Sequence, residues 1–140
     1  MKIQNWDVWL VAFANAAVGK PWKIGKTDCV TLTRRALTQM LGRDPWDGVV
    51  RHWTTLKKAR QVAGQLDALD VLESTGAFEV GWHFGTAGDV ALGPPDEDYG
   101  LPGLSIIVPQ RHALISTKDR GVELIDKLTL PEGTRFYRYE

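Results

Sequence analysis

The sequence predicts a single α+β domain over residues 1–140, in which N-terminal helices pack on a C-terminal antiparallel sheet. Up to about residue 76, apolar side chains recur three and four positions apart, as on the buried face of a helix. Beyond that point, short segments rich in β-branched and aromatic residues alternate with glycine and proline, as strands and turns do. Helices followed by strands favour an antiparallel sheet over a wound parallel one. The length of 140 residues and the hydrophobic content of 44% suit one domain.

A first helix is expected from about Trp6 to Val18. Asn5 is placed to cap its N-terminus, and Gly19, followed by Lys20-Pro21, ends it. The residues expected on its buried stripe are Trp6, Trp9, Leu10, Phe13 and Ala17. This stripe predicts that the helix packs against the rest of the domain along most of its length.

A second helix is expected after the loop of residues 21–26, with Thr27 or Asp28 as its N-cap, and runs to about Leu41. Gly42 follows its end, as glycine commonly does. Its expected apolar face consists of Cys29, Leu32 or Thr33, Ala36, Leu37, Met40 and Leu41. This spacing puts Cys29, the single cysteine of the chain, in the first turn, on or beside the buried side.

The remaining elements follow from turn signals and from a change of period. Residues 43–53 contain Asp44-Pro45 and Asp47-Gly48 and predict an irregular segment. A third helix is expected to begin near Thr54 or Thr55, and a shorter helical piece over residues 69–72 ends at Gly76. The expected strands are Phe78–Trp82, Asp89–Leu92, Leu104–Val108, Ala113–Ser116, Val122–Ile125 and Arg135–Tyr139.

Charge and composition exclude several classes of protein. The 17 basic and 17 acidic residues give no net charge, so no overall field attracts nucleic acid. No apolar run reaches the ~20 residues of a membrane span. The N-terminus lacks the apolar core of a signal peptide, and one cysteine forms no internal disulfide, so synthesis in a reducing cytoplasm is expected. The three histidines have no metal-ligand spacing, so neither a metal nor another cofactor is expected.

Cys29 is the residue best placed for chemistry. A helix N-terminus carries a partial positive charge and unpaired N–H groups, both of which stabilise a thiolate. Cys29 is therefore a candidate nucleophile. The alternative is that it is a small buried hydrophobe that fills the gap between helix and sheet.

An ordered set of short motifs supports the reactive interpretation. The loop Pro21-Trp22-Lys23-Ile24-Gly25 leads into Asp28-Cys29, the stretch Gly42-Arg43-Asp44-Pro45 follows the cysteine helix, and Gly88-Asp89-Val90 opens the sheet. In this order the chain resembles the NlpC-type peptidoglycan peptidases, and most closely their divergent branch in bacteriophage tails. The resemblance implies a papain-like fold in which Cys29 is the nucleophile that attacks a peptide of the bacterial cell wall.

The resemblance also implies a histidine base at the start of the second sheet strand, near residues 103–105, and no histidine is there. His112 lies by the turn at the other end of the expected hairpin, about 16 Å away at ~3.3 Å per residue. His83, between Trp82 and Phe84, is the remaining candidate base and would have to fold back toward Cys29. Its alternative role is that of a half-buried packing residue.

The long connection of residues 94–103 is a candidate contact surface. It carries Tyr99 and Leu101, the candidate partner-binding residues, next to the acidic residues 96–98, which are also placed to supply an acid near Gly103. Four tryptophans in or near loops are candidates for lining a groove or an interface, namely Trp22, Trp46, Trp53 and Trp82. A mobile surface loop without a partner is the alternative interpretation of the connection.

Three functions remain open at this stage. The first is a tail-tip component of a phage virion, made in the host cytoplasm, with an NlpC-like fold and an incomplete catalytic dyad, which docks on other tail proteins, chiefly the tail hub. The second is an active peptidoglycan endopeptidase that uses Cys29 with an unrecognised base such as His83. The third is an unrelated binding module in which Cys29 is only a packing residue.

Overall fold

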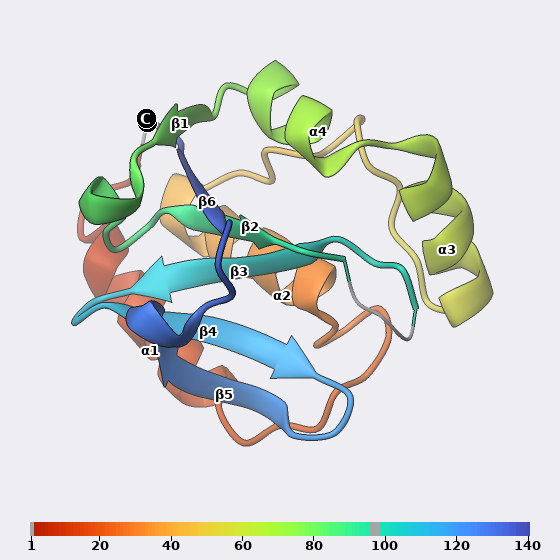
Figure 1. Cartoon of the computed structure of the whole chain (residues 1–140), viewed down its shortest axis with the longest axis horizontal. Helices are drawn as coiled ribbons and strands as arrows, with labels where there is room; N and C mark the ends of the chain where they lie inside the picture. Colours follow the sequence, from red (N-terminus) through yellow and green to blue (C-terminus); the bar gives the residue numbers. More distant parts are fainter. Residues whose placement is uncertain (1, 96–98) are drawn as a thin grey trace.

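The structure is a computed structural model that describes residues 2–95 and 99–140. Helices α1 (Trp6–Ala17) and α2 (Cys29–Leu41) lie side by side on one face of a six-stranded antiparallel sheet (Figure 1). The strands are β1 (Phe78–Val80), β2 (Val90–Gly93), β3 (Gly103–Val108), β4 (His112–Thr117), β5 (Gly121–Asp126) and β6 (Arg135–Arg138), in the spatial order β1-β6-β2-β3-β4-β5. The predicted α+β class and antiparallel sheet are confirmed.

Helix α1 matches its expected span, but two details of the expectation are wrong. Its buried residues are Leu10, Ala14 and Ala17, whereas Trp9 is 52% exposed and does not belong to the core stripe. Asn5 adopts a left-handed conformation at φ 59° and makes no side-chain bond to the helix, so it is not a side-chain cap. The packing of Leu10 and Ala14 against α2 and the sheet therefore fixes α1 without help from a capping side chain.

Between α2 and the sheet, the chain forms an irregular segment and two further helices, α3 (Leu56–Gln65) and α4 (Ala68–Ser74). Thr55 caps α3 by accepting a bond from the Lys58 N–H. Trp46 and Trp53 are only 1% and 7% exposed, and both line an apolar pocket together with residues of α3 and α4, so the expectation that they line a groove is confirmed. Both indoles are core residues of the segment that joins α2 to α3.

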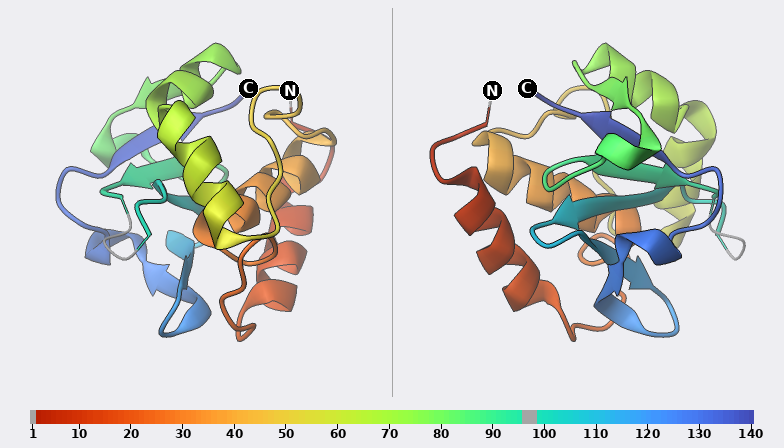
Figure 2. Two further views of the ribbon diagram at one scale, coloured as in Figure 1. Left: turned by 90° about the vertical axis from the view of Figure 1, so that its right-hand side faces the viewer. Right: turned by 60° about the vertical axis from the view of Figure 1, so that its left-hand side comes forward.

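The first strand is shorter than expected because Trp82–Phe84 forms a 3-10 turn, η1, instead of extending β1. The Lys127 ammonium stabilises this turn by donating to the carbonyl oxygens of Trp82 and Gly85, each at 2.8 Å. The ring of Trp82 packs on Phe136, on the face of the sheet opposite the helices. Figure 2 shows η1 and the connection from β5 to β6 on this outer face, with α1 and α2 on the other.

The hairpin of β3 and β4 has the expected register. Ile106 pairs with Leu114 and Val108 pairs with His112. His112 therefore lies at the turn end, and the start of β3 lies next to the end of β4 at the opposite end of the sheet. Among the described residues, no helix is both long enough and apolar enough to span a membrane.

Candidate functional site at the start of helix α2

The loop that precedes α2 is folded around a single backbone carbonyl. The N–H groups of Lys26, Thr27 and Asp28 all donate to the carbonyl oxygen of Lys23, at 2.9–3.1 Å. Gly25 lies at φ +78°, and a Cβ on it would clash with the carbonyl oxygen of Trp53. The aromatic-x-x-glycine pattern of residues 22–25 thus has a structural basis, because only glycine combines this conformation with so close an approach.

Asp28 holds the loop, the helix and the buried indole together. One carboxylate oxygen accepts from the Thr31 N–H at 2.9 Å, as an N-cap does. The other accepts from the Gly25 N–H at 2.6 Å, the Thr31 hydroxyl at 2.8 Å and Trp53 Nε1 at 3.2 Å. Asp28 is fully buried, so these bonds replace the water that its carboxylate would otherwise bind. Asp28 therefore fixes the position of the residue that follows it.

That residue, Cys29, is the first residue of α2 and is half-buried. Its thiol donates to the carbonyl oxygen of Pro102, just before β3, with Sγ and O 3.2 Å apart. Two effects on the sulfur oppose each other here. The helix N-terminus favours a thiolate, whereas a bond donated to a carbonyl oxygen favours the protonated thiol.

Cys29 opens onto a cavity of about 400 Å³ at the end of the sheet where β3 begins and β4 ends. The cavity combines apolar strand residues with several hydroxyl groups and one charge of each sign, from Lys118 and Asp119. Its other lining residues are Ala91, Gly93, Pro94, Gly103, Leu104, Ser105, Ile115, Ser116, Thr117, Ile125, Leu130, Pro131 and Thr134. The cavity is large enough to hold a side chain of a partner or several water molecules.

Ser116 is a cavity residue that sequence reasoning did not select. It is 7% exposed, and its hydroxyl has no hydrogen-bond partner among the residues that the structure describes. Strand alternation puts it on the same face as Leu114, which packs under the helices. The predicted hairpin register places residue 103 opposite residue 116 or 117. This register was the sequence signal from which the position of Ser116 near Cys29 could have been predicted.

Leu104 occupies the helix-facing position at the start of β3, within the range of residues 103–105 where a histidine base was expected. It pairs with Leu92 of β2, is 6% exposed, and lines the same cavity as Cys29. In the described part of the chain no histidine lines this cavity, and all three histidines of the sequence belong to that part. An aliphatic side chain at this position supplies no proton acceptor.

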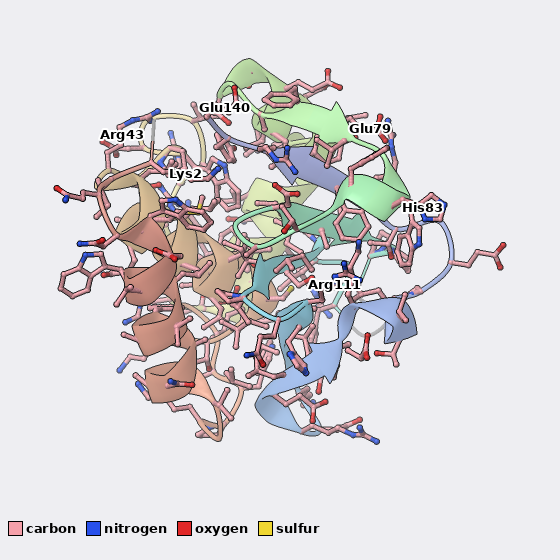
Figure 3. All side chains as sticks on the ribbon, turned by 90° about the vertical axis from the view of Figure 1, so that its left-hand side faces the viewer. Lys2, Arg43, Glu79, His83, Arg111 and Glu140 are labelled. Atoms are coloured by element: carbon pink, nitrogen blue, oxygen red, sulfur yellow. The ribbon has the colours of Figure 1, made fainter. Side chains whose placement is uncertain are left out.

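The structure does not bring His83 and Cys29 together. His83 is exposed on η1, at the edge of the sheet where β1 lies and near Glu79 (Figure 3). Cys29 lies on the helix-covered side, at the end of the sheet where β3 starts (Figure 1). His112 is about 16 Å from that end, five residues along the ladder at ~3.3 Å each. His52 is highly exposed and lies 3.9 Å from the Asp44 carboxylate.

Of the two predicted partner-binding residues, only Tyr99 has an accessible side chain. Leu101 is 1% exposed and is part of the core, so the expectation of a contact surface does not hold for it. The Tyr99 ring stacks on Trp22 at 5.4 Å between ring centroids, which connects this loop to the one before α2. Lys118 Nζ lies 5.1 Å from the centroid of the same ring. The acidic residues 96–98, predicted as possible acids, lie outside the described residues.

The Gly88-Asp89 pair has a structural role in the site. Gly88, at φ +90°, faces α1 and α2 so closely that a Cβ would meet Met40 Sδ and Trp6 at 3.0 Å. Asp89 is fully buried and accepts two bonds from Arg138. The motif thus brings the first long strand against the helices and requires no catalytic role.

No group of three or more potential metal ligands forms among the residues that the structure describes. The Lys127 ammonium, held against η1, has its pKa lowered, first because burial removes water from the charge and second because Arg111 repels it. Lys127 lies under the outer face of the sheet and does not line the Cys29 cavity. Its perturbed pKa therefore reflects a structural contact and not a catalytic one.

Residues 1–136 of the chain match a family model described as "Domain of unknown function (DUF6950)". The comparison with curated proteins gave no match.

Proposed function

The chain belongs to the DUF6950 family, and we propose that this member is a bacteriophage tail-tip component with an NlpC-like fold that docks other tail proteins without cleaving peptide bonds. Three features support the fold part of the proposal. A glycine-containing loop leads into the Asp28 cap, Cys29 begins a helix that packs on an antiparallel sheet, and Gly88-Asp89 opens the long strands. The docking part rests on which residue occupies the position expected for the catalytic histidine.

The observation that carries the proposal is Leu104 at the place of the base. A cysteine peptidase needs an imidazole within hydrogen-bond reach, about 2.6–3.2 Å, of its nucleophile or connected to it by one water. The Pro102 carbonyl oxygen accepts the bond from Cys29, and Leu104, at the start of β3, lines the same cavity as Cys29. His112 lies at the β3–β4 turn, and His83 lies on η1 near Glu79.

The contacts of Cys29 are also compatible with a role that needs no catalysis. The thiol of Cys29 donates to the backbone of the 94–103 connection, and Tyr99 of the same connection stacks on Trp22. The first contact joins the start of α2 to the loop before β3, and the second joins the loop before α2 to the same connection. Cys29 then serves as a structural tie between the helical layer and the sheet, and the connection presents Tyr99 at the surface as a contact for a partner such as the tail hub.

Phage genetics tests the docking role directly. In the phage that encodes the chain, deletion of its gene should yield particles without a functional tail tip, as seen by electron microscopy and loss of plaques. Cys29→Ser should retain normal particles and plaque numbers, because a hydroxyl still donates to Pro102. Normal particles after deletion, together with plaque loss in the Cys29→Ser phage, would contradict the docking role.

A cell-wall digestion assay tests the alternative function, peptidoglycan endopeptidase. Purified sacculi are incubated with the wild-type chain and with the Cys29→Ala variant, and the soluble muropeptides are analysed by mass spectrometry. We expect no release by either protein. Release by the wild type that disappears in Cys29→Ala would establish the endopeptidase and overturn the proposal.

A further inference from the structure

The pocket that Trp46 and Trp53 line lies between the irregular segment, the start of β3 and the junction of α3 with α4. All of the described residues that line it have apolar side chains. The indole N–H of Trp46 is bonded elsewhere, to the Tyr139 hydroxyl at 2.9 Å. That of Trp53 donates to the Asp28 carboxylate at 3.2 Å. A water molecule or polar group inside this pocket would therefore lose the hydrogen bonds that it makes in solution.

The volume of the pocket limits what it can hold. It measures about 40 Å³, whereas one water molecule needs about 10–15 Å³ and benzene binds in an apolar cavity of about 150 Å³. The pocket is therefore too small for an aromatic ring. The branched end of a valine, leucine or isoleucine side chain has a suitable size, and its transfer from water to apolar walls is favourable.

The pocket opens into a larger groove at the surface. Its half-buried lining residues also line an outer groove of about 570 Å³, and they are Ala63, Leu66, Ala68 and Pro102. The walls of the outer groove are partly polar, because Gln65 and Asp67 contribute to them. A polar groove that leads into a small apolar pocket suits a peptide, with its main chain outside and one side chain inside. A lipid acyl chain would instead need apolar walls along its whole length.

Gly64 is a second observation that indicates a ligand at the outer groove. It lies in the last turn of α3 and lines this groove. Glycine destabilises a helix relative to alanine, so a glycine in a helix needs a reason. Gly64 is not in a left-handed conformation, and an added Cβ would have no atom from the described parts of the chain within 4 Å. The missing side chain leaves space for a main chain that approaches the helix closely.

We propose that this two-part site binds a peptide segment of another protein, which inserts one branched aliphatic side chain into the pocket over Trp46 and Trp53. The main chain of the segment lies in the outer groove beside Gly64. The proposal goes beyond the proposed function, because Cys29 lines neither cavity and the peptide need not belong to a tail protein.

NMR titration of the full chain with two blocked amino acids tests the proposal. The probes are N-acetyl-leucine-N-methylamide and its asparagine counterpart, whose side chain has a similar shape but is polar. The indole N–H signals of Trp46 and Trp53 report on the pocket. The leucine probe should shift both signals with a dissociation constant of about 1 mM, as expected for so small a ligand. The asparagine probe should bind at least about tenfold more weakly, because its amide would lose water in the pocket.

Two variants of α3 locate the binding site. Ala63→Leu places a larger apolar side chain at the mouth of the pocket and should abolish the shifts. Gln61→Leu is the matched control, because it adds the same side chain at an exposed position that lines neither cavity. Leucine is a good helix former, so both variants should fold. The control should bind the leucine probe like the wild type.

Gly64→Ala tests the place of the main chain. The variant should have a higher melting temperature than the wild type, because alanine favours the helix, but should bind the leucine probe about threefold more weakly or worse. A glycine with no role in binding would give the first effect without the second. Indole signals that the leucine probe does not shift, equal affinity for both probes, or full binding by Ala63→Leu or Gly64→Ala would each overturn the proposal. None of these results bears on the docking role, which the phage experiment tests.

Discussion

Arg138 and Asp89 form a two-pronged ion pair that ties the last strand to the residue before β2. Arg138 Nε donates to Asp89 Oδ1 at 2.9 Å, and Nη2 donates to Oδ2 at 3.0 Å. The Asp89 side chain is completely buried, and that of Arg138 is 25% exposed. The Thr86 N–H is a further donor to Asp89, at 2.8 Å. The attraction of the guanidinium offsets most of the free-energy cost of removing this carboxylate from water.

Removing the guanidinium should therefore be costly. Arg138→Leu leaves the Asp89 carboxylate buried with the Thr86 N–H as its remaining donor, and we expect the free energy of unfolding to fall by about 3 kcal/mol. Urea denaturation followed by tryptophan fluorescence measures the loss. Arg135→Leu is the matched control, because Arg135 makes the same two-pronged contact with Glu79 at the surface. An equal loss in both variants would contradict a special role for burial.

Gly25 should tolerate no side chain. Gly25→Ala puts a Cβ against the Trp53 carbonyl and breaks the left-handed turn, and we expect a loss of about 2 kcal/mol or more. Gly48 has the same φ of +78° with nothing within 4 Å of the added Cβ. Gly48→Ala therefore measures the conformational cost alone, about 1 kcal/mol. The difference between the two losses of unfolding free energy measures the cost of the contact with Trp53. Equal losses would show that this contact adds nothing to the conformational cost.

The pH dependence of the free energy of unfolding should show the contribution of the buried Tyr139 phenol. Burial raises the pKa of Tyr139, and this effect is opposed by its hydrogen bonds with Thr75 and Trp46. Above pH 10 the unfolded chain loses this proton while the folded chain keeps it, so the unfolded state binds fewer protons. The free energy of unfolding should then decrease as pH rises above 10.

Tyr139→Phe separates this effect from other groups that titrate in alkali, such as Lys127, whose pKa is lowered. The variant loses the acceptor of the Trp46 indole at every pH, but its stability should depend less on pH above 10 than that of the wild type. Urea midpoints at pH 8, 10 and 11, with tyrosinate absorbance at 295 nm, check the prediction. Parallel curves for the two proteins would exclude Tyr139 as the group responsible.

Much of the fold followed from local signals in the sequence. Asp28 and Gly42 mark the ends of α2 because capping depends on neighbouring residues only. The register of β3 and β4 followed from the length of the turn between them, so the distance of His112 from the start of β3 was predictable. Helix caps and tight turns depend on residues that are close in sequence, so a single sequence is enough to predict them.

Features that depend on distant parts of the chain were not predictable. The buried indoles of Trp46 and Trp53 lie in a segment without period, and their partners are Tyr139 and Asp28. The end of β1 is set by Lys127, more than forty residues later in the sequence. Periodicity placed Trp9 on the core stripe of α1, whereas the sheet covers only the narrower sector of Leu10 and Ala14. Each error arose where a tertiary contact, or its absence, overrode a local pattern.

Alkylation of the single cysteine should report which effect dominates at its sulfur. The bond to the Pro102 carbonyl favours the thiol, so we expect iodoacetamide to label folded Cys29 at pH 7 no faster than the urea-unfolded chain. The rate should increase with pH as more of the thiol ionises. A fast rate that is already constant between pH 6 and 7 would mean that the helix N-terminus dominates and that a thiolate is present.

Truncating the same side chain should cost little stability. Cys29 is half-buried, and its thiol is a weak donor to the Pro102 carbonyl oxygen, so Cys29→Ala should lower the free energy of unfolding by about 1 kcal/mol or less. Thermal or urea denaturation with the wild type as reference checks this. An unfolded variant would show that the tie between the helix and Pro102 is essential to the fold, which the size of this contact does not predict.

Leu104→His should create the base that the site lacks. The new imidazole would stand on the helix-facing side of β3, in the cavity that Cys29 lines, and a general base there should raise the alkylation rate of Cys29 at pH 7 by about tenfold or more. Leu104→Asn is the matched control, because it makes the position polar without adding a base. Both replace a buried leucine and should lose about 2–4 kcal/mol of stability, so circular dichroism must first show that each variant is folded.

The pH profile distinguishes a true pair from a local loosening of the structure. If the imidazole accepts the thiol proton, the labelling rate of Leu104→His rises with a midpoint near the histidine range, below that of the wild type. If Leu104→His does not fold, Ser116→His places an imidazole on the neighbouring strand, at a position whose hydroxyl bonds to none of the described residues. Equal labelling rates and equal pH profiles in the histidine and asparagine variants would mean that residue 104 does not face the sulfur. Leu104 would then not occupy the position of a lost catalytic base.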